Sequence, residues 1–391
     1  MIKIGNLEID KFYLGDKSDA KIYLGDVKVW PEEATYDFKL HYATSGGSEV
    51  TINCDESWEQ PLRSVLPTIN LLEIGDCTTT IPTSGFTIKG GTTSKPKYYG
   101  LQICPKFTMS DSVTKINDYG MYAFRYTTEY TPTLEESVLS KNITYIGQYG
   151  LREWKFGDIS FPNNFSGYNY SFWDITASTI TIGENAYLVG YTFSILSANT
   201  ITIGDGFNNP TTVGLFTSVS ANTINIGNGT LAARTGGCFS NDCVIQNLNI
   251  NSNYNTHYPL FEKNRGTIKN VTYGNDVTVI GESAFSGRTE LSSVVIGNSV
   301  TSIGSSAFDS CRSLTSLVIP SNISSIGSSA FYGCSGLTSI TVQSATPPTL
   351  ESLAFDETNN CPIYVPSESV DAYKAASGWS KYASRIQAIP T

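Results

Sequence analysis

Charged residues, histidine and clustered positive charge are all scarce in this sequence. Asp, Glu, Lys and Arg make up 15% of the 391 residues, whereas about 25% is usual for a soluble domain. The formal net charge is −10 at pH 7, and Lys and Arg form no cluster along the chain. Because such a surface repels phosphate groups, we expect neither nucleic acid nor an anionic membrane as a partner.

Long apolar runs are absent as well. No stretch reaches the roughly 18 apolar residues of a membrane-spanning helix, so we expect no membrane insertion. Residues 1–26 alternate apolar and charged positions, where a secretory signal would hold an uninterrupted apolar segment. We therefore expect the chain to stay in the cell that makes it unless lysis releases it.

The cysteines and histidines do not have the spacing of a metal site. None of the eight cysteines belongs to a C-x-x-C pair, and only His41 and His257 could assist them, so we expect no metal and no cofactor. Cys311 and Cys334 occupy the same place in successive repeats, where the preceding repeat has Arg288. We expect buried thiols there, and a disulfide between neighbouring coils is the alternative.

Motifs for catalysis are missing too. The sequence has no G-x-S-x-G or H-E-x-x-H motif, and its acidic residues are scattered. We therefore expect that the protein is not an enzyme and has no catalytic residues. A polysaccharide-cleaving solenoid, in which folding brings two distant carboxylates together, is the enzymatic alternative.

What the sequence does contain is a repeat of 23 residues. VTSIGSSAFDSC at 300–311 returns as ISSIGSSAFYGC at 323–334, and such a period predicts small units that bury their apolar faces by stacking. The apolar pattern L-x-x-L-x-L, which is typical of the strand of a leucine-rich repeat, begins at the same interval five times. Its first positions are Ile245, Ile268, Leu291, Leu314 and Leu337.

The second half of each unit reads V-T-x-I-G-x-x-A-F. We expect its glycine, at 281, 304 and 327, to permit a turn that a Cβ would hinder. The phenylalanines, Phe285, Phe308 and Phe331, should stack as an apolar core.

Weaker copies of this unit extend the array toward the N-terminus, and a cap follows it. We infer about ten coils over 70–350. Residues 351–391 should close the exposed end of the solenoid with a short helix that Ser367 caps. Val370, Tyr373 and Trp379 should face the last coil.

The segment VTSIGSSAFDSCRSLTSLVIP resembles the BspA-like leucine-rich repeats, closely over 271–355 and more weakly over 113–270. The resemblance implies a mostly β, leucine-rich-repeat solenoid that serves adhesion and recognition on surfaces, with no catalytic motif to carry over. Residues 42–62, followed by 73–81, are similar to the small β lead-in that often precedes such arrays, and we place this lead-in at 32–69. The tail IYVPSESVDAYKAASGWSKYASRI resembles the C-terminal cap of the family, which we place at 351–391.

The N-terminal segment FYLGDKSDAKIYLGDVKVWP resembles a short β module at the start of virion proteins of tailed phages from gut bacteria. That resemblance implies a virion attachment module over 1–31, and an ordinary β-hairpin is the alternative. Its candidate attachment residues are Tyr13, Leu14, Tyr23, Leu24 and Trp30.

Together these features predict a non-enzymatic phage virion structural protein, a head fibre, tail fibre or decoration, displayed on the virion surface. Its expected partners are other virion proteins through the N-terminus and a host-surface glycan or protein. The alternative is a bacterial cell-surface or secreted BspA-like adhesin, which needs an export route. The sequence leaves trimer formation open, because it shows no coiled coil.

A recognition face would lie on the solvent side of the repeat strands. Small hydroxyl and amide side chains there can hydrogen-bond sugars or peptides, although solubility alone also explains them. The candidate face consists of Asn247, Asn249, Asn270, Thr272, Ser293, Ser316, Ser339 and Thr341.

Overall fold

The computed structural model forms a mostly β solenoid of about ten turns with a repeat near 23 residues, which confirms the predicted fold class. Its residues divide into two compact units, 1–178 and 179–391. The candidate attachment residues Tyr13, Leu14, Tyr23, Leu24 and Trp30 lie outside the described residues. The structure describes residues 2–4, 7–9, 38–43, 49–54, 69–74, 80–81, 88–90, 97–99, 107–122, 136–210, 214–231, 238–240, 242–252 and 266–390.

The first unit begins with short strands, several of them antiparallel. A four-stranded sheet has the order β4-β3-β5-β9, and two separate pairs are β1 with β2 and β7 with β8. These strands are β1 (Ile2–Ile4), β2 (Leu7–Ile9), β3 (Phe38–Ala43), β4 (Glu49–Cys54), β5 (Ile69–Ile74), β7 (Ile88–Gly90), β8 (Lys97–Tyr99) and β9 (Phe107–Met109).

Parallel coils follow within the same unit. Ile116 pairs with Ile81 and with Ile146, so the weak copies of the repeat around Ile116 and Ile146 do form coils. Their strands are β6 (Thr80–Ile81), β10 (Lys115–Ile116), β11 (Met121–Tyr122), β12 (Glu136–Ser137), β13 (Tyr145–Ile146), β14 (Leu151–Arg152), β15 (Lys155–Phe156), β16 (Asp158–Phe161), β17 (Ser166–Gly167) and β18 (Phe172–Ile182), within which the division between the units lies.

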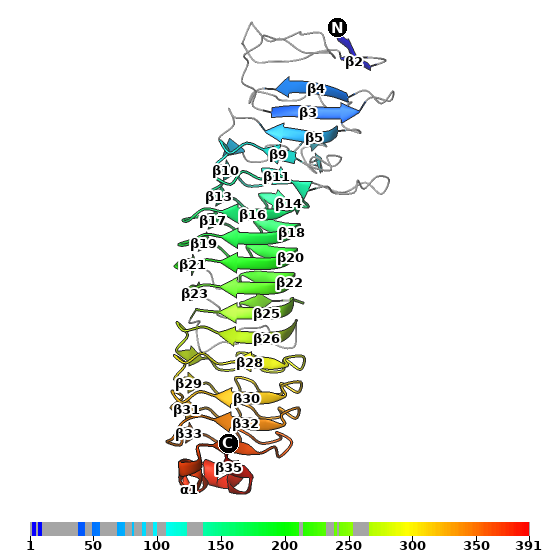
Figure 1. The fold of residues 1–391 in the computed structure, drawn as a ribbon. Coiled ribbons are helices and arrows are strands. Elements are labelled where there is room, and N and C mark those ends of the chain that lie inside the picture. The colour runs from blue at the N-terminus through cyan, green and yellow to red at the C-terminus, as the bar shows by residue number, and fades with distance from the viewer. Residues whose placement is uncertain are drawn as a thin grey trace. The chain divides into compact units, whose positions relative to one another are not determined.

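In the second unit the strands stack in chain order down to α1 (Figure 1). The long strands are β20 (Phe193–Ile203), β22 (Phe216–Ile226), β25 (Val244–Ile250) and β26 (Thr267–Tyr273), followed by β28 (Ser293–Val295), β30 (Ser316–Ile319), β32 (Ser339–Val342), β34 (Ile363–Val365) and β35 (Ile386–Ala388). The short strands are β19 (Tyr187–Leu188), β21 (Phe207–Asn209), β23 (Gly229–Leu231), β24 (Phe239–Ser240), β27 (Val279–Ile280), β29 (Ser302–Ile303), β31 (Ser325–Ile326) and β33 (Thr349–Leu350).

A column of stacked phenylalanines forms the centre of the regular coils. The ring centroids of Phe285 and Phe308 are 5.6 Å apart, those of Phe308 and Phe331 5.2 Å, and those of Phe331 and Phe355 5.6 Å. All four side chains are fully buried. The prediction that this aromatic series is core is therefore confirmed, and the column extends one coil further, to Phe355.

Five cysteines of the solenoid and its cap are buried thiols. Cys238, Cys243, Cys311, Cys334 and Cys361 are all free and buried. The thiols of Cys311 and Cys334 donate hydrogen bonds to the carbonyl oxygens of Phe285 and Phe308, at 3.3 and 3.1 Å. At Cys311 and Cys334 the predicted space-filling thiol is confirmed over the disulfide.

The repeat glycines Gly304 and Gly327 allow close packing between coils at the start of a turn. The φ of Gly304 is not in the left-handed region, but a Cβ there would lie 2.7 Å from the backbone nitrogen of Glu282 in the preceding coil. The left-handed turn falls two residues later, where Ser306 has φ 53°. Gly304 opens this turn, since its carbonyl oxygen accepts a hydrogen bond from the N–H of Ala307 at 3.3 Å, and a Cβ there is hindered, as predicted, by contact with the preceding coil and not by a left-handed φ.

We expect Gly304→Ala to lower the free energy of unfolding by about 1–3 kcal/mol, because the added methyl pushes two backbones apart. Ser305→Ala, at the next position, is the matched control and should change stability by less than about 0.5 kcal/mol. Urea unfolding followed by circular dichroism compares the two. If Gly304→Ala were as stable as the wild type, the coils could move apart to accommodate the methyl group without loss of free energy, which would contradict the prediction.

Three short helical segments and a last strand close the C-terminal end. They are η3 (Ser367–Ser369), α1 (Val370–Ala375) and η4 (Trp379–Arg385), before β35. Ser367 makes no capping bond and its hydroxyl contacts the Glu368 carboxylate instead. The prediction of an N-cap at Ser367 is wrong, because a 3-10 turn over residues 367–369 precedes the α-helix.

The cap is fixed to the last coils by buried aromatic side chains. The Tyr373 hydroxyl donates to the Ser344 carbonyl oxygen at 2.8 Å, and Trp379 Nε1 donates to the Pro348 carbonyl oxygen at 2.8 Å. Tyr373 and Trp379 are fully buried, whereas Val370 is half-buried. The expectation that Tyr373 and Trp379 face the last coil is confirmed.

The buried phenol of Tyr373 makes the stability of the cap sensitive to alkali. Burial raises the pKa of Tyr373 to about 12, against about 10 in an unfolded chain. Above pH ~10 the unfolded state releases this proton while the folded state retains it, so stability is constant below that pH and falls toward pH ~12. We expect Tyr373→Phe to flatten this decline in denaturation curves recorded at increasing pH, and an unchanged slope would contradict the assignment.

Candidate functional site

The eight candidate residues lie in two neighbouring rows on the solvent face of the second unit. In the first row Asn247 pairs with Asn270 and Asn270 with Ser293, while Ser316 pairs with Ser339 one sheet further on. In the second row Asn249 pairs with Thr272, and Thr341 lies beyond. All eight are exposed or half-buried. The strand register thus brings the predicted side chains onto one face.

Two exposed valines interrupt the second row. Val295 pairs with Thr272, and Val318 pairs with Thr341. Their side chains are 54% and 47% exposed. The prediction selected polar residues only and therefore missed this apolar part of the face.

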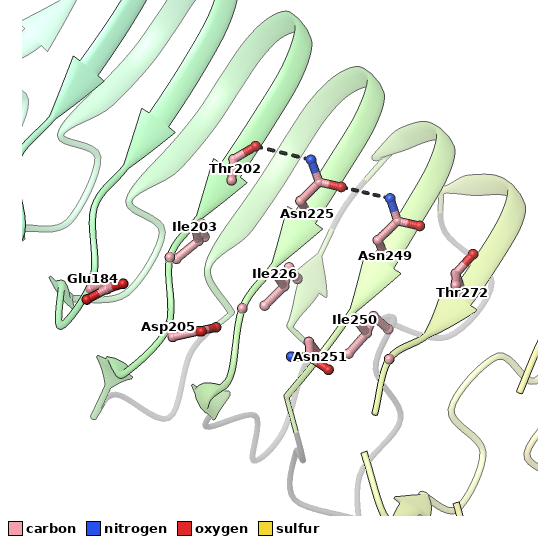
Figure 2. A pocket seen from close by; sticks show the side chains of 13 residues that line it. Glu184, Thr202, Ile203, Asp205, Asn225, Ile226, Asn249, Ile250, Asn251 and Thr272 are labelled. Carbon is pink, nitrogen blue, oxygen red and sulfur yellow. Dashed lines mark hydrogen bonds between the residues drawn. The ribbon is translucent and has the colours of Figure 1, made fainter. Parts of the chain in front are cut away.

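Side-chain amides bond to one another along the rows. Asn225 Nδ2 donates to Thr202 Oγ1 at 3.1 Å, and Asn249 Nδ2 donates to Asn225 Oδ1 at 2.7 Å (Figure 2). In the other row Asn270 Nδ2 donates to Asn247 Oδ1 at 2.9 Å. Each amide keeps further hydrogen-bonding capacity beyond its bond within the row. The rows therefore present amide groups of fixed orientation.

A groove lies where four long strands end, at β20, β22, β25 and β26. Its volume is about 400 Å³. Ile203, Ile226 and Ile250 form its apolar lining together with glycines, while Thr202, Asn225, Asn249 and Thr272 project beside it (Figure 2). Two of the eight predicted residues, Asn249 and Thr272, thus line a concavity.

Glycine allows the strand ends beside this groove to pack closely. A Cβ on Gly227 would lie 2.5 Å from Asp205 Oδ1, and one on Gly274 would overlap the side chain of Asn251. Asp205 Oδ1 is held in place because it accepts a hydrogen bond from the backbone N–H of Asn228 at 2.8 Å. The strand ends thus pack closely along their backbones beside the groove.

The groove is lined by carboxylates and amides and by no cationic side chain. Glu184 and Asp205 supply the charge, and Asn251 adds a third amide to those of Asn225 and Asn249. Such a lining favours neutral hydroxyl-rich groups over anions. Glu184, Asp205, Asn225 and Asn251 were missed from the sequence. The polar residue that follows I-G in TIGE and TIGD would have pointed to the first two.

Within the described part of the chain, no three His, Cys, Asp or Glu side chains gather as metal ligands would. No helix in that part is long and apolar enough to cross a bilayer.

Three of the solved structures similar to this chain have low sequence identity to it. A leucine-rich repeat protein from Bacteroides ovatus is 14% identical, with 92% of this chain and 100% of that one covered and a TM-score of 0.32. The pneumococcal vaccine antigen PcpA is 15% identical, with coverage of 79% and 83% and a TM-score of 0.26. A leucine-rich cell surface protein from Faecalibacterium prausnitzii is 15% identical, with coverage of 82% and 95% and a TM-score of 0.29.

Among proteins with curated descriptions, none matches this chain. The family described as BspA type leucine-rich repeat region matches in six copies over residues 92–211, 117–241, 168–289 and 258–376. These overlapping matches span more than half of the 391 residues. They include the weak upstream coils as well as the regular ones. The chain belongs to the BspA type leucine-rich repeat family.

Proposed function

We propose that this chain is a non-enzymatic recognition protein that displays its solenoid on a biological surface. The observation that carries the proposal is the pair of hydrogen-bonded rows beside the groove. Their amides are oriented before any ligand arrives, which lowers the entropy lost on binding. A flat sheet face with such rows suits contact with an extended surface ligand, a host glycan or protein.

Two settings are consistent with this role. A phage virion, as a head fibre, tail fibre or decoration, is supported by the resemblance of residues 1–31 to a virion module. In that setting 1–31 contacts other virion proteins, 32–69 is a lead-in, 70–350 is the solenoid and 351–391 is the cap. A bacterial cell surface is supported by family membership, since BspA-like proteins are typically found there.

Peptide mass spectrometry of density-purified phage particles and of washed cell envelopes from one culture separates the settings. Stoichiometric recovery with particles supports the virion role, and removal of residues 1–31 should then abolish incorporation. Recovery with envelopes alone supports the adhesin. Recovery only in the soluble cell fraction would contradict surface display altogether.

A further inference from the structure

The first unit carries a strip of aromatic side chains on its surface. Tyr119 and Tyr149 stack with ring centroids 5.3 Å apart, and Tyr149 and Tyr170 stack at 5.0 Å. Trp173 lies against the last two, with its ring centroid 4.9 Å from that of Tyr149 and 4.8 Å from that of Tyr170. Tyr119 is 37% exposed, and the other three are half-buried. We call these four residues the tyrosine strip.

The fold does not require aromatic residues at these positions. Tyr119, Tyr149 and Tyr170 have φ of 57°, 52° and 59°, the left-handed conformation that bulky residues seldom adopt. The regular coils place serine at the same point of the turn, as at Ser306 with φ 53°. At this point of the turn the backbone N–H of Tyr119 donates a hydrogen bond to the Gln148 carbonyl oxygen of the next coil at 2.9 Å.

In the regular coils, the N–H of Ser306 donates to the Ser328 carbonyl oxygen at the same distance of 2.9 Å. Serine therefore satisfies this turn, and the tyrosine rings add a surface that the coil itself does not need. A bulky residue kept in a sparsely populated conformation is a reason to look for a function at that place.

The strip is close to neutral. The Arg152 guanidinium lies over the Trp173 ring, 5.4 Å from its centroid, and its Nε is 2.9 Å from the Glu153 carboxylate. The Asp118 carboxylate accepts a hydrogen bond from the backbone N–H of Gln148 at 2.7 Å. Burial, and then the neighbouring phenols, raise the pKa of Tyr149. With one cation and two carboxylates beside it, the tyrosine strip offers ring edges and hydroxyls with little net charge and no excess of positive charge.

We propose that the tyrosine strip binds a linear neutral polysaccharide. Neighbouring tyrosine rings of the strip are 5.3 and 5.0 Å apart, which is about the length of one pyranose unit in a linear polysaccharide. A row of identical groups at this interval fits a ligand with the same repeat. Because the stacked rings cover one another's faces, the strip presents a row of ring edges and phenol hydroxyls, which can contact a sugar chain and hydrogen-bond its hydroxyl groups. A protein partner would call for an apolar centre with a polar rim, whereas this strip repeats the same amphipathic group along its length.

The test is affinity gel electrophoresis of the full chain in gels that contain a soluble neutral polysaccharide, namely a β-glucan, a galactomannan or an arabinoxylan. Anionic hyaluronan is the comparison. We expect retardation by at least one neutral polymer and none by hyaluronan. The triple variant Tyr119→Ser, Tyr149→Ser, Tyr170→Ser installs the residue of the regular coils and should weaken binding at least tenfold.

Two controls separate binding from folding. Tyr187→Ser removes a tyrosine of similar exposure, 39%, outside the strip and should bind as the wild type does. The triple Tyr→Phe variant retains the stacked rings and should lose binding in part, through the missing hydroxyls. Retardation by none of the three neutral polymers, or equal binding by the triple serine variant, would overturn the proposal. So would retardation by hyaluronan alone. None of these results depends on where the protein is located.

Discussion

We expect Phe308→Ala to lower the free energy of unfolding by about 3–5 kcal/mol, the usual loss for a buried phenylalanine in a core that cannot collapse around the cavity. Phe308 is fully buried, and both faces of its ring are covered, by Phe285 at 5.6 Å and Phe331 at 5.2 Å. The neighbouring coils cannot move inward to fill the space, because backbone hydrogen bonds such as Phe285 N to Ala307 O hold their spacing.

The control for this variant lies in the next coil. Tyr332 is 37% exposed, and Tyr332→Ala should change stability by less than about 0.5 kcal/mol. Urea unfolding followed by circular dichroism measures both variants. A loss below about 1 kcal/mol for Phe308→Ala would mean that the phenylalanine column is not the main core of these coils.

The sequence was sufficient for those parts of the fold that depend on local pattern. Ile268 and Leu291 start strand signatures 23 residues apart. The structure pairs β26 with β28 at the same interval, as in Asn270 with Ser293. Phe308 could be assigned to the core because every unit of the regular array has the same residue there. Tyr373 and Trp379 could be placed in the cap because a solenoid end needs an apolar cover.

The geometry between coils could not be derived in the same way. Gly304 is needed because the preceding backbone passes within contact distance, a fact that depends on the spacing of two coils. The amide row through Asn225 and Asn249 joins residues 24 positions apart, whereas the regular interval is 23. Because of this one extra residue, the 23-residue interval does not place Asn225 opposite Asn249. Their pairing is visible only in the folded chain. The groove beside Asn249 could therefore be located only from the structure.

The chemistry of the tyrosines also depended on their conformation. From sequence, Tyr119 and Tyr149 were only aromatic residues in irregular coils. Their left-handed φ places them at the turn position that Ser306 occupies in a regular coil, and that equivalence shows the ring to be additional to the needs of the fold. A pattern of residue types does not contain φ, so this comparison was not available before the structure.

We expect Trp379→Ala to lower stability by about 3–5 kcal/mol, with the loss concentrated at the C-terminal end. The Trp379 ring closes the phenylalanine column, with its centroid 5.8 Å from Phe355 and 4.8 Å from Tyr373, and it is fully buried. Because each coil of a solenoid contacts only its neighbours, losing the cap frees the last coil first. Hydrogen exchange should therefore accelerate in β33 and β35 before it does in β27.

Fraying of this end should also make the protein self-associate. Loosening of η4 uncovers strand edges, which pair readily with another chain, so sedimentation of the variant should depend on concentration where that of the wild type does not. Lys381→Ala is the matched control in the same helical segment. It breaks the ion pair with Asp356 at 2.6 Å, an exposed contact worth at most about 1 kcal/mol. Unchanged exchange in β33 and β35 of Trp379→Ala would show that the cap is held by its hydrogen bonds, such as those of Arg385 to Cys361 and Phe355, rather than by the buried indole.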